Sequence, residues 1–99
     1  DPFGKHIVDI GSWGVLQGHL FRPKGVTVSE KNIVYISDSY MGVIQAFTDL
    51  GRFLGVICEN NKLRKFKSPV GILIDKSDRL LVVEMRGNAI TVLKILEGK

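Results

Sequence analysis

Apolar side chains recur at every second position along most of the chain, as in Val26-x-Val28 and Val34-x-Ile36. A period of two is typical of β-strands whose two faces differ, and the spacing of an amphipathic helix is absent. The alternation predicts strands at about 24–29, 33–37, 43–48 and 52–57, and again at about 70–75, 79–84 and 89–94.

The same strand pattern occurs twice, at a fixed offset of 46 residues. Apolar positions fall on apolar positions, and turn positions fall on turn positions. The matching pairs include Pro23 with Pro69, Gly25 with Gly71, Val26 with Ile72, Val28 with Ile74, Asn32 with Asp78, Val34 with Leu80, Ile36 with Val82, Asp38 with Glu84, Ile44 with Ile90 and Phe47 with Leu93. A repeat of this length, built from four short strands, is typical of a β-propeller blade.

Short connections rich in turn-forming residues join the predicted strands. Residues 30–32 and 76–78 separate the first two strands of each copy, and residues 49–51 separate the third and fourth strands of the first copy. Such connections favour tight antiparallel hairpins. The predicted fold is therefore all-β, a propeller with two four-stranded antiparallel blades per chain.

The sequence begins with the fourth strand of one blade and ends after the third strand of another. Gly4-Lys5-His6-Ile7 aligns with Gly51-Arg52-Phe53-Leu54, so residues 5–10 match a fourth strand, which the second copy lacks. We expect one partial propeller over 1–99, with boundaries as follows: an outer strand and loop at 5–18 belonging to a blade that another chain completes, a first full blade at 19–58, and a loop with three strands at 59–99. Pairing of the first and last strands within one chain is not expected, because two blades cannot close a ring, and unpaired edges invite another chain.

The residues resemble the NHL repeat family over about 4–95. The resemblance rests on Phe21-x-Pro23-x-Gly25-Val26-x-Val28, Ile33-Val34-Tyr35-Ile36-Ser37-Asp38-Ser39, Val43-Ile44-Gln45-Ala46-Phe47 and Gly51-Arg52-Phe53-Leu54, and on their counterparts in 66–93. It implies a propeller of usually six blades, which three copies of this chain would complete with threefold symmetry. Glu84 replaces the usual aspartate, and Gly42 and Val43 stand where asparagine and arginine are common, which implies more apolar contacts there.

The resemblance does not select a function. Proteins with this repeat include RNA-binding modules, scaffolds for protein partners, secreted or periplasmic proteins, and a few enzymes such as the peptidylglycine-amidating lyases. The compartment therefore stays open, with a secreted or periplasmic parent among the alternatives. Function has to be argued from sites.

The net charge of +4 is local rather than general. It comes from a cluster of four basic residues, the candidate nucleic-acid or anion-binding set: Lys62, Arg64, Lys65 and Lys67. Proteins that bind single-stranded nucleic acid also need aromatic side chains on which bases can stack. This segment offers only Phe66, which the repeat assigns to the core. No apolar run approaches the roughly 18 residues of a membrane span, so none is expected.

The connections after the second and fourth strands of each blade emerge on one side of the sheet, which predicts a partner-binding surface there. Its candidate residues are Tyr40, Met41, Met85, Arg86 and Trp13. Tyr40 and Met41 are the strongest of these, because strand packing does not require large apolar groups at a turn. Trp13 either fills a blade junction, which is slightly favoured, or anchors a partner.

Candidate chemistry is sparse. Asp38 and Glu84 either form a carboxylate pair or accept hydrogen bonds from turn backbone, and their repetition favours the second interpretation. His6 and His19 have no ligand partner at metal spacing, and Cys58 is the single cysteine, so no metal, cofactor or catalytic residue is expected. An active site in blades outside this chain is the enzymatic alternative.

The sequence thus predicts a non-catalytic binding or scaffold module that uses the loop side of the propeller for a protein partner. The ring would be completed by a homotrimer or by further blades of a parent chain. Two alternatives stay open: RNA binding through the basic residues of 62–67, and a trimeric propeller that holds a carbohydrate or small ligand in grooves between blades.

Overall fold

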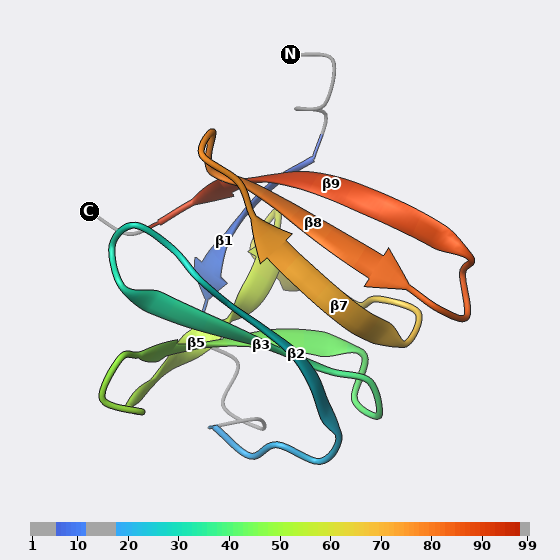
Figure 1. The fold of residues 1–99 in the computed structure, drawn as a ribbon, viewed down its shortest axis with the longest axis horizontal. Coiled ribbons are helices and arrows are strands. Elements are labelled where there is room, and N and C mark those ends of the chain that lie inside the picture. The colour runs from blue at the N-terminus through green and yellow to red at the C-terminus, as the bar shows by residue number, and fades with distance from the viewer. Residues whose placement is uncertain (1–5, 12–17, 98–99) are drawn as a thin grey trace.

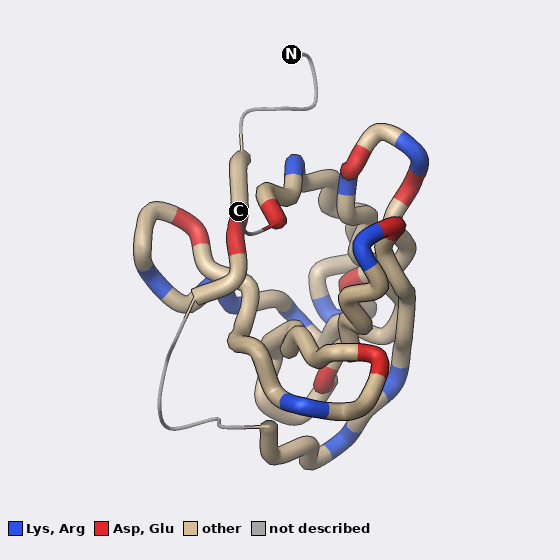
Figure 2. Tube along the Cα trace, turned by 90° about the vertical axis from the view of Figure 1, so that its left-hand side faces the viewer, with Lys and Arg blue, Asp and Glu red and all other residues tan. Residues whose placement is uncertain are grey.

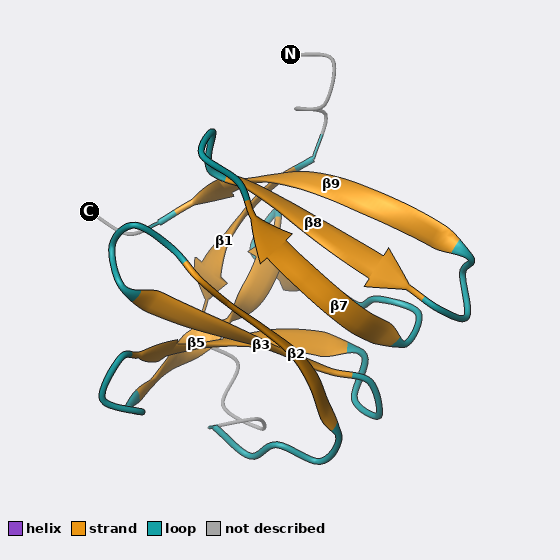
Figure 3. Cartoon of the chain, viewed as in Figure 1, coloured by secondary structure: helices purple, strands orange, loops and turns teal. Residues whose placement is uncertain are grey.

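The computed structural model describes residues 6–11 and 18–97, and within them all regular structure is β-strand (Figures 1 and 3). The strands are β1 (Ile7–Gly11), β2 (Pro23–Val28), β3 (Ile33–Asp38), β4 (Val43–Thr48), β5 (Phe53–Glu59), β6 (Lys62–Leu63), β7 (Pro69–Ile74), β8 (Arg79–Glu84) and β9 (Ala89–Leu96). Eight of the nine were predicted, each within two residues of its observed ends. The all-β class is confirmed.

Two antiparallel meanders carry the repeat. Strands β2, β3, β4 and β5 pair in sequence order and form the first unit, and β7, β8 and β9 form the second. Asn32 and Asp78, at matching positions of the β2–β3 and β7–β8 turns, both have positive φ, 62° and 60°. Asparagine and aspartate tolerate this conformation better than other non-glycine residues, so the same turn chemistry builds the same hairpin twice.

Strand β1 lies between the two units. It pairs antiparallel with β5, with Ile10 opposite Ile57, and parallel with β9, with Ile7 opposite Lys94. The expectation that the first and last strands would not pair within one chain is therefore wrong. A single extended segment satisfies the free edges of β5 and β9 together, which removes two exposed edges at once.

Strand β6 was not predicted. Residues 59–68 were interpreted as one loop, but Lys62–Leu63 folds back on β5 and places Leu63 opposite Cys58. The turn between them is Asn60-Asn61, with φ of 54° and 63°. Two consecutive residues with positive φ make the tight hairpin turn whose twist matches paired strands.

The sheet nearly closes on itself. Its strand order is β2-β3-β4-β5-β1-β9-β8-β7, and the two strands that end this order, β2 and β7, lie against each other (Figure 1). The backbone N–H of Ile74 donates to Thr27 Oγ1 at 3.2 Å across this junction. The sheet therefore has one inner face and one outer face.

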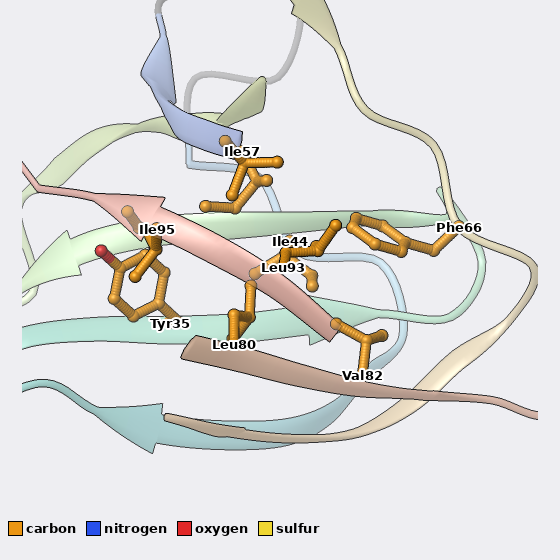
Figure 4. Packing of buried hydrophobic residues seen from close by; sticks show 10 residues of the cluster. Tyr35, Ile44, Ile57, Phe66, Leu80, Val82, Leu93 and Ile95 are labelled. Atoms are coloured by element: carbon orange, nitrogen blue, oxygen red, sulfur yellow. The ribbon is translucent and has the colours of Figure 1, made fainter. Parts of the chain in front are cut away.

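The inner face holds the hydrophobic core. Side chains from both units point toward one another in Figure 4, and the buried cluster contains Val8, Tyr35, Ile44, Ala46, Ile57, Phe66, Leu80, Val82, Leu93 and Ile95. Phe66 is buried, as the repeat predicted. The core is thus shared by the two units, and neither could bury its apolar face alone.

Matching positions of the repeat face opposite ways in the two units. Leu80 and Val82 of the second unit point into the core, whereas their counterparts Val34 and Ile36 lie on the outer face. Conversely, Tyr35 is fully buried inside the first unit, while its counterpart Leu81 lies on the outer face of the second. The two units therefore pack through non-equivalent faces: the face that the first unit buries corresponds in the repeat to the outer face of the second unit.

Candidate functional site

Four segments meet on one side of the sheet and form what we call the loop face: turns 39–42 and 85–88, and segments 18–22 and 64–68. Backbone hydrogen bonds connect them: Ser39 N–H to Arg22 O at 2.9 Å, Phe66 N–H to Gly42 O at 2.8 Å and Met85 N–H to Ser68 O at 3.0 Å. The predicted gathering of these connections on one side is therefore present in the structure.

Asp38 organises the first half of the loop face. Its buried carboxylate accepts four backbone N–H donors: Phe21 at 2.6 Å, Arg22 at 3.2 Å, and Tyr40 and Met41 at 3.0 Å each. Two donors come from the segment before β2 and two from the β3–β4 turn. One carboxylate thus fixes two loops against each other, through hydrogen bonds that its charge strengthens.

Glu84 occupies the matching position in the second unit, where it accepts one backbone and one side-chain donor. Its Oε1 accepts the backbone N–H of Lys67 at 2.7 Å, and its Oε2 accepts the hydroxyl of Thr91. Lys67 matches Phe21 in the repeat, so the contact is the counterpart of the Phe21–Asp38 hydrogen bond. The interpretation as an acceptor for turn backbone is confirmed for Asp38, whereas the backbone N–H that Glu84 accepts comes from the segment before β7.

The exposed side chains on this frame are aromatic and apolar. Tyr40 is 70% exposed and Phe21 59%, and their ring centroids lie 6.0 Å apart in a tilted arrangement. Met41 is only half-buried and packs against the cluster of Val43, Val56 and Cys58. Of the two strongest candidates, Tyr40 is therefore presented to solvent and Met41 mainly supports it.

Phe21 was missed as a site residue because it was interpreted only as part of the repeat motif. The signal that could have found it lies in the alignment. Phe21 matches Lys67, an exposed residue, whereas the buried Phe66 matches Leu20. An aromatic ring at a position that its copy fills with lysine is not required by the core.

Met85 and Arg86, the other two described candidates, are both exposed in the β8–β9 turn. Met85 borders an open hollow of about 580 Å³. The other lining residues are Val83, Glu84, Asn88, Ala89 and Ile90. Trp13 lies outside the described residues.

The four clustered basic residues do not act as one group. The Arg64 guanidinium bonds Glu59 Oε1 at 2.6 Å and lies 5.1 Å above the ring of Phe66, and Lys65 Nζ donates to Met41 O at 2.6 Å. Lys62 and Lys67 are exposed. Figure 2 shows blue basic and red acidic positions spread together over several turns, so the described residues present mixed charge.

Glu59 also receives a histidine from the far end of the chain. His6 Nδ1 lies 2.7 Å from Glu59 Oε2, although 53 positions separate the two residues. This hydrogen bond, with the contribution of Arg64, holds the pKa of Glu59 below its ordinary value of 4.5. Among the described residues, no group of three or more His, Cys, Asp or Glu side chains is arranged to hold a metal ion, and no helix is long and apolar enough to cross a membrane.

No protein-family model matches the sequence, and no curated protein compared with it matches. Among solved structures, the chain is similar to one titled "Streptogramin B lyase structure", with a TM-score of 0.42 and 13% sequence identity. The match covers 86% of this chain and 29% of that one, so the chain spans less than a third of its length. The proposals that follow rest on the residues of this chain.

Proposed function

We propose that the chain is a non-catalytic binding or scaffold module that recognises a protein partner through the loop face, with Tyr40 and Phe21 as anchors. The observation that supports this most directly is the exposed ring pair held by a buried carboxylate. Asp38 accepts the backbone N–H of both anchor residues, so the two rings are carried on a fixed frame.

A fixed aromatic pair is well suited to protein recognition. Each ring offers a large apolar area, and the Tyr40 hydroxyl adds a polar tip. A frame that is already hydrogen-bonded has less conformational freedom to lose on binding, so more of the contact energy appears as affinity. Met85, 67% exposed on the neighbouring turn, extends the apolar contact area toward the second unit.

We further propose that the two units are blades of the NHL type, within a ring that three copies of this chain would complete. Support comes from the matching roles of Asp38 and Glu84, which repeat at the family's motif position with the same backbone partner segment. The shared core supports it as well, because the two units pack through non-equivalent faces, as successive blades of a propeller do.

RNA binding through residues 62–67 is the less favoured alternative. Arg64 is engaged by Glu59 and Phe66, and Lys65 by the carbonyl of Met41, so binding a phosphate would break existing contacts. A carbohydrate alternative would use hollows such as that beside Met85. Its lining residues carry no aromatic ring on which a sugar could stack.

A phage-displayed library of random peptides, selected on the immobilised chain, tests the proposal. Enriched peptides should bind the wild-type chain and lose at least about tenfold in affinity on Tyr40→Ala or Phe21→Ala, the effect of removing an interface anchor. Leu50→Ala is the matched control, because Leu50 is 93% exposed in the distant β4–β5 turn.

Failure to enrich any peptide, or an equal loss of affinity on Leu50→Ala, would contradict partner binding by the loop face. A fluorescent oligouridylate and a panel of monosaccharides, measured on the same chain at low salt, separate the alternatives. Oligouridylate binding that weakens steeply with salt would favour RNA.

A further inference from the structure

Each unit has two apolar faces, and the two units pack together through one face of each. On the opposite face of the first unit, Val43, Val56 and Cys58 form a second, smaller buried cluster. The first unit buries the face that carries Tyr35 and Ala46, and the second unit buries the opposite face, with Leu80 and Val82. One face of each unit is therefore left on the outside of the sheet. In the repeat, the outer face of each unit corresponds to the face that the other unit buries. The exposed parts of the two outer faces are therefore available for a contact of the same type.

The outer face of the second unit is formed by Leu73, Leu81, Val83, Ile90 and Val92, which lie opposite one another across β7, β8 and β9. Leu73 is 56% exposed, Val83 43% and Ile90 66%. Apolar side chains that adjoin one another over three strands form a patch rather than isolated surface residues. Such patches mark interaction sites.

Comparison with the buried copy of this face strengthens the point. Thr27 and Ser37 match Leu73 and Val83, and both are on the inner, packed face of the first unit. The second unit thus carries leucine and valine in the open where the first carries threonine and serine inside. A face selected for contact with water would show the reverse.

The outer face of the first unit is the complementary half. Val26 and Val28 are each more than half exposed, and their counterparts Ile72 and Ile74 pack against the core. A hollow of about 240 Å³ opens beside Val26. Farther along the same face, Gln45 is buried and donates to His19 O at 2.7 Å, so only the β2–β3 part is open.

We propose that a second copy of this chain docks head to tail, placing the Val26 and Val28 face of its first unit on the Leu73, Val83 and Ile90 face. The contact repeats the packing between the two units inside one chain, where Ile72 and Ile74 meet the face that contains Thr27 and Tyr35. It is heterologous, so each copy retains one open face of each kind until a ring closes.

This inference rests on the ring proposal and deepens it, since it names the surfaces that join copies. None of its residues belongs to the loop face, although Val83 and Ile90 line the hollow that Met85 borders. Two variants each block one face: Leu73→Lys with Ile90→Lys on the second unit, and Val26→Lys with Val28→Lys on the first. All four positions are exposed in the single chain, so folding should survive, which circular dichroism checks. Leu50→Lys is the matched control at an exposed leucine of neither face.

Light scattering gives the result. The wild-type chain and Leu50→Lys should have masses that are multiples of 11.0 kDa, whereas each blocked variant should have the mass of one chain, with affinity lowered about a hundredfold or more. An equimolar mixture of the two blocked variants should have twice the single-chain mass. The intact first-unit face of one variant can then pack on the intact second-unit face of the other.

A wild-type chain that stays monomeric, a blocked variant that still assembles, or a mixture that stays monomeric would overturn the inference. If both blocked variants keep the mass of the wild-type assembly, the ring proposal is not contradicted, but these faces are not the contacts between its copies. Should the lysine variants unfold, Leu73→Thr with Val83→Ser replaces them, because the first unit already accommodates those residues. Unchanged assembly by that variant would also overturn the inference.

Discussion

Gly25 and Gly71, matching residues of the two units, meet where β2 passes β7: a Cβ built on Gly25 would lie 3.2 Å from Gly71 Cα. That Cβ would also lie 3.0 Å from Ser37 Oγ and 3.2 Å from Ile72 N. The two edges of the sheet can approach this closely because Gly25 carries no side chain at the contact.

Gly25→Ala should therefore lower the free energy of unfolding by roughly 1–3 kcal/mol, as overpacking does. Gly71→Ala is the matched control, because its Cβ would point outward and meet only the Val83 side chain, at 3.6 Å. Its effect should be smaller than that of Gly25→Ala. Urea unfolding of both variants measures the difference, and equal losses would show that the close approach does not limit packing.

Asp38→Ala should destabilise the chain by about 3 kcal/mol or more, because four backbone donors lose a charged acceptor in a buried position. The loss should be visible in urea unfolding, together with broadened amide resonances for residues 21–22 and 40–41. Asp49→Ala, in an exposed turn, should change the free energy of unfolding by less than about 0.5 kcal/mol. A change of that size in Asp38→Ala would contradict the role assigned to the carboxylate.

Tyr35→Phe should reduce the loss of stability in alkali. Burial raises the pKa of Tyr35 above its ordinary value of 10.0, and the hydrogen bond from its hydroxyl to Glu97 Oε2, at 2.7 Å, raises it further. The folded chain then holds a proton that the unfolded chain releases. The contribution is full below pH 10.0 and is lost as the pH rises above it.

Urea unfolding between about pH 9 and pH 12 tests this, since the free energy of unfolding should fall less steeply in Tyr35→Phe than in the wild type. Tyr40→Phe, at the exposed tyrosine, is the control for removal of a phenol hydroxyl. Identical slopes in all three chains would exclude Tyr35 as the source.

Glu59→Gln should flatten the loss of stability in acid. The hydrogen bond with His6 lowers the pKa of Glu59, and Arg64 lowers it further. A group whose pKa is lowered by folding contributes stability above its ordinary value, here 4.5, and that contribution is lost as the pH falls through the lowered pKa. Thermal unfolding between about pH 6 and pH 3 should show a shallower decline for Glu59→Gln, with Glu30→Gln in the exposed β2–β3 turn as the control.

Much of the fold was predictable because alternating apolar residues mark the positions of the strands, and the 46-residue offset repeats these positions in a second copy. Val34 and Leu80, for example, match as strand residues although one lies outside and the other inside. The alternation could not show which of the two apolar faces each unit would bury. Nor could it show that β1 would pair in parallel with β9, since strand edges carry backbone groups that leave no trace in the sequence.

The candidate site was predictable in position but not in detail. A turn tip with Tyr40 is visible in the sequence, and so is the repeated carboxylate of Asp38. The engagement of Arg64 by Glu59 is not, because it depends on the hairpin that Asn60-Asn61 makes and β6 completes. That dipeptide was the available signal, since asparagine favours the positive φ of tight turns.

The position of β1 also constrains the order in which the molecule can fold. Ile7 pairs with Lys94, so β1 cannot complete its pairing until β9, which lies more than 80 positions later, is in place. The first unit can form its own hairpins early, but its edge at β5 and the core residue Val8 are not secured until β9 has been made. Because contacts so distant in sequence are slow to form, the nearly closed sheet implies a late step of folding, before which the edges of β5 and β9 are open to association with other chains.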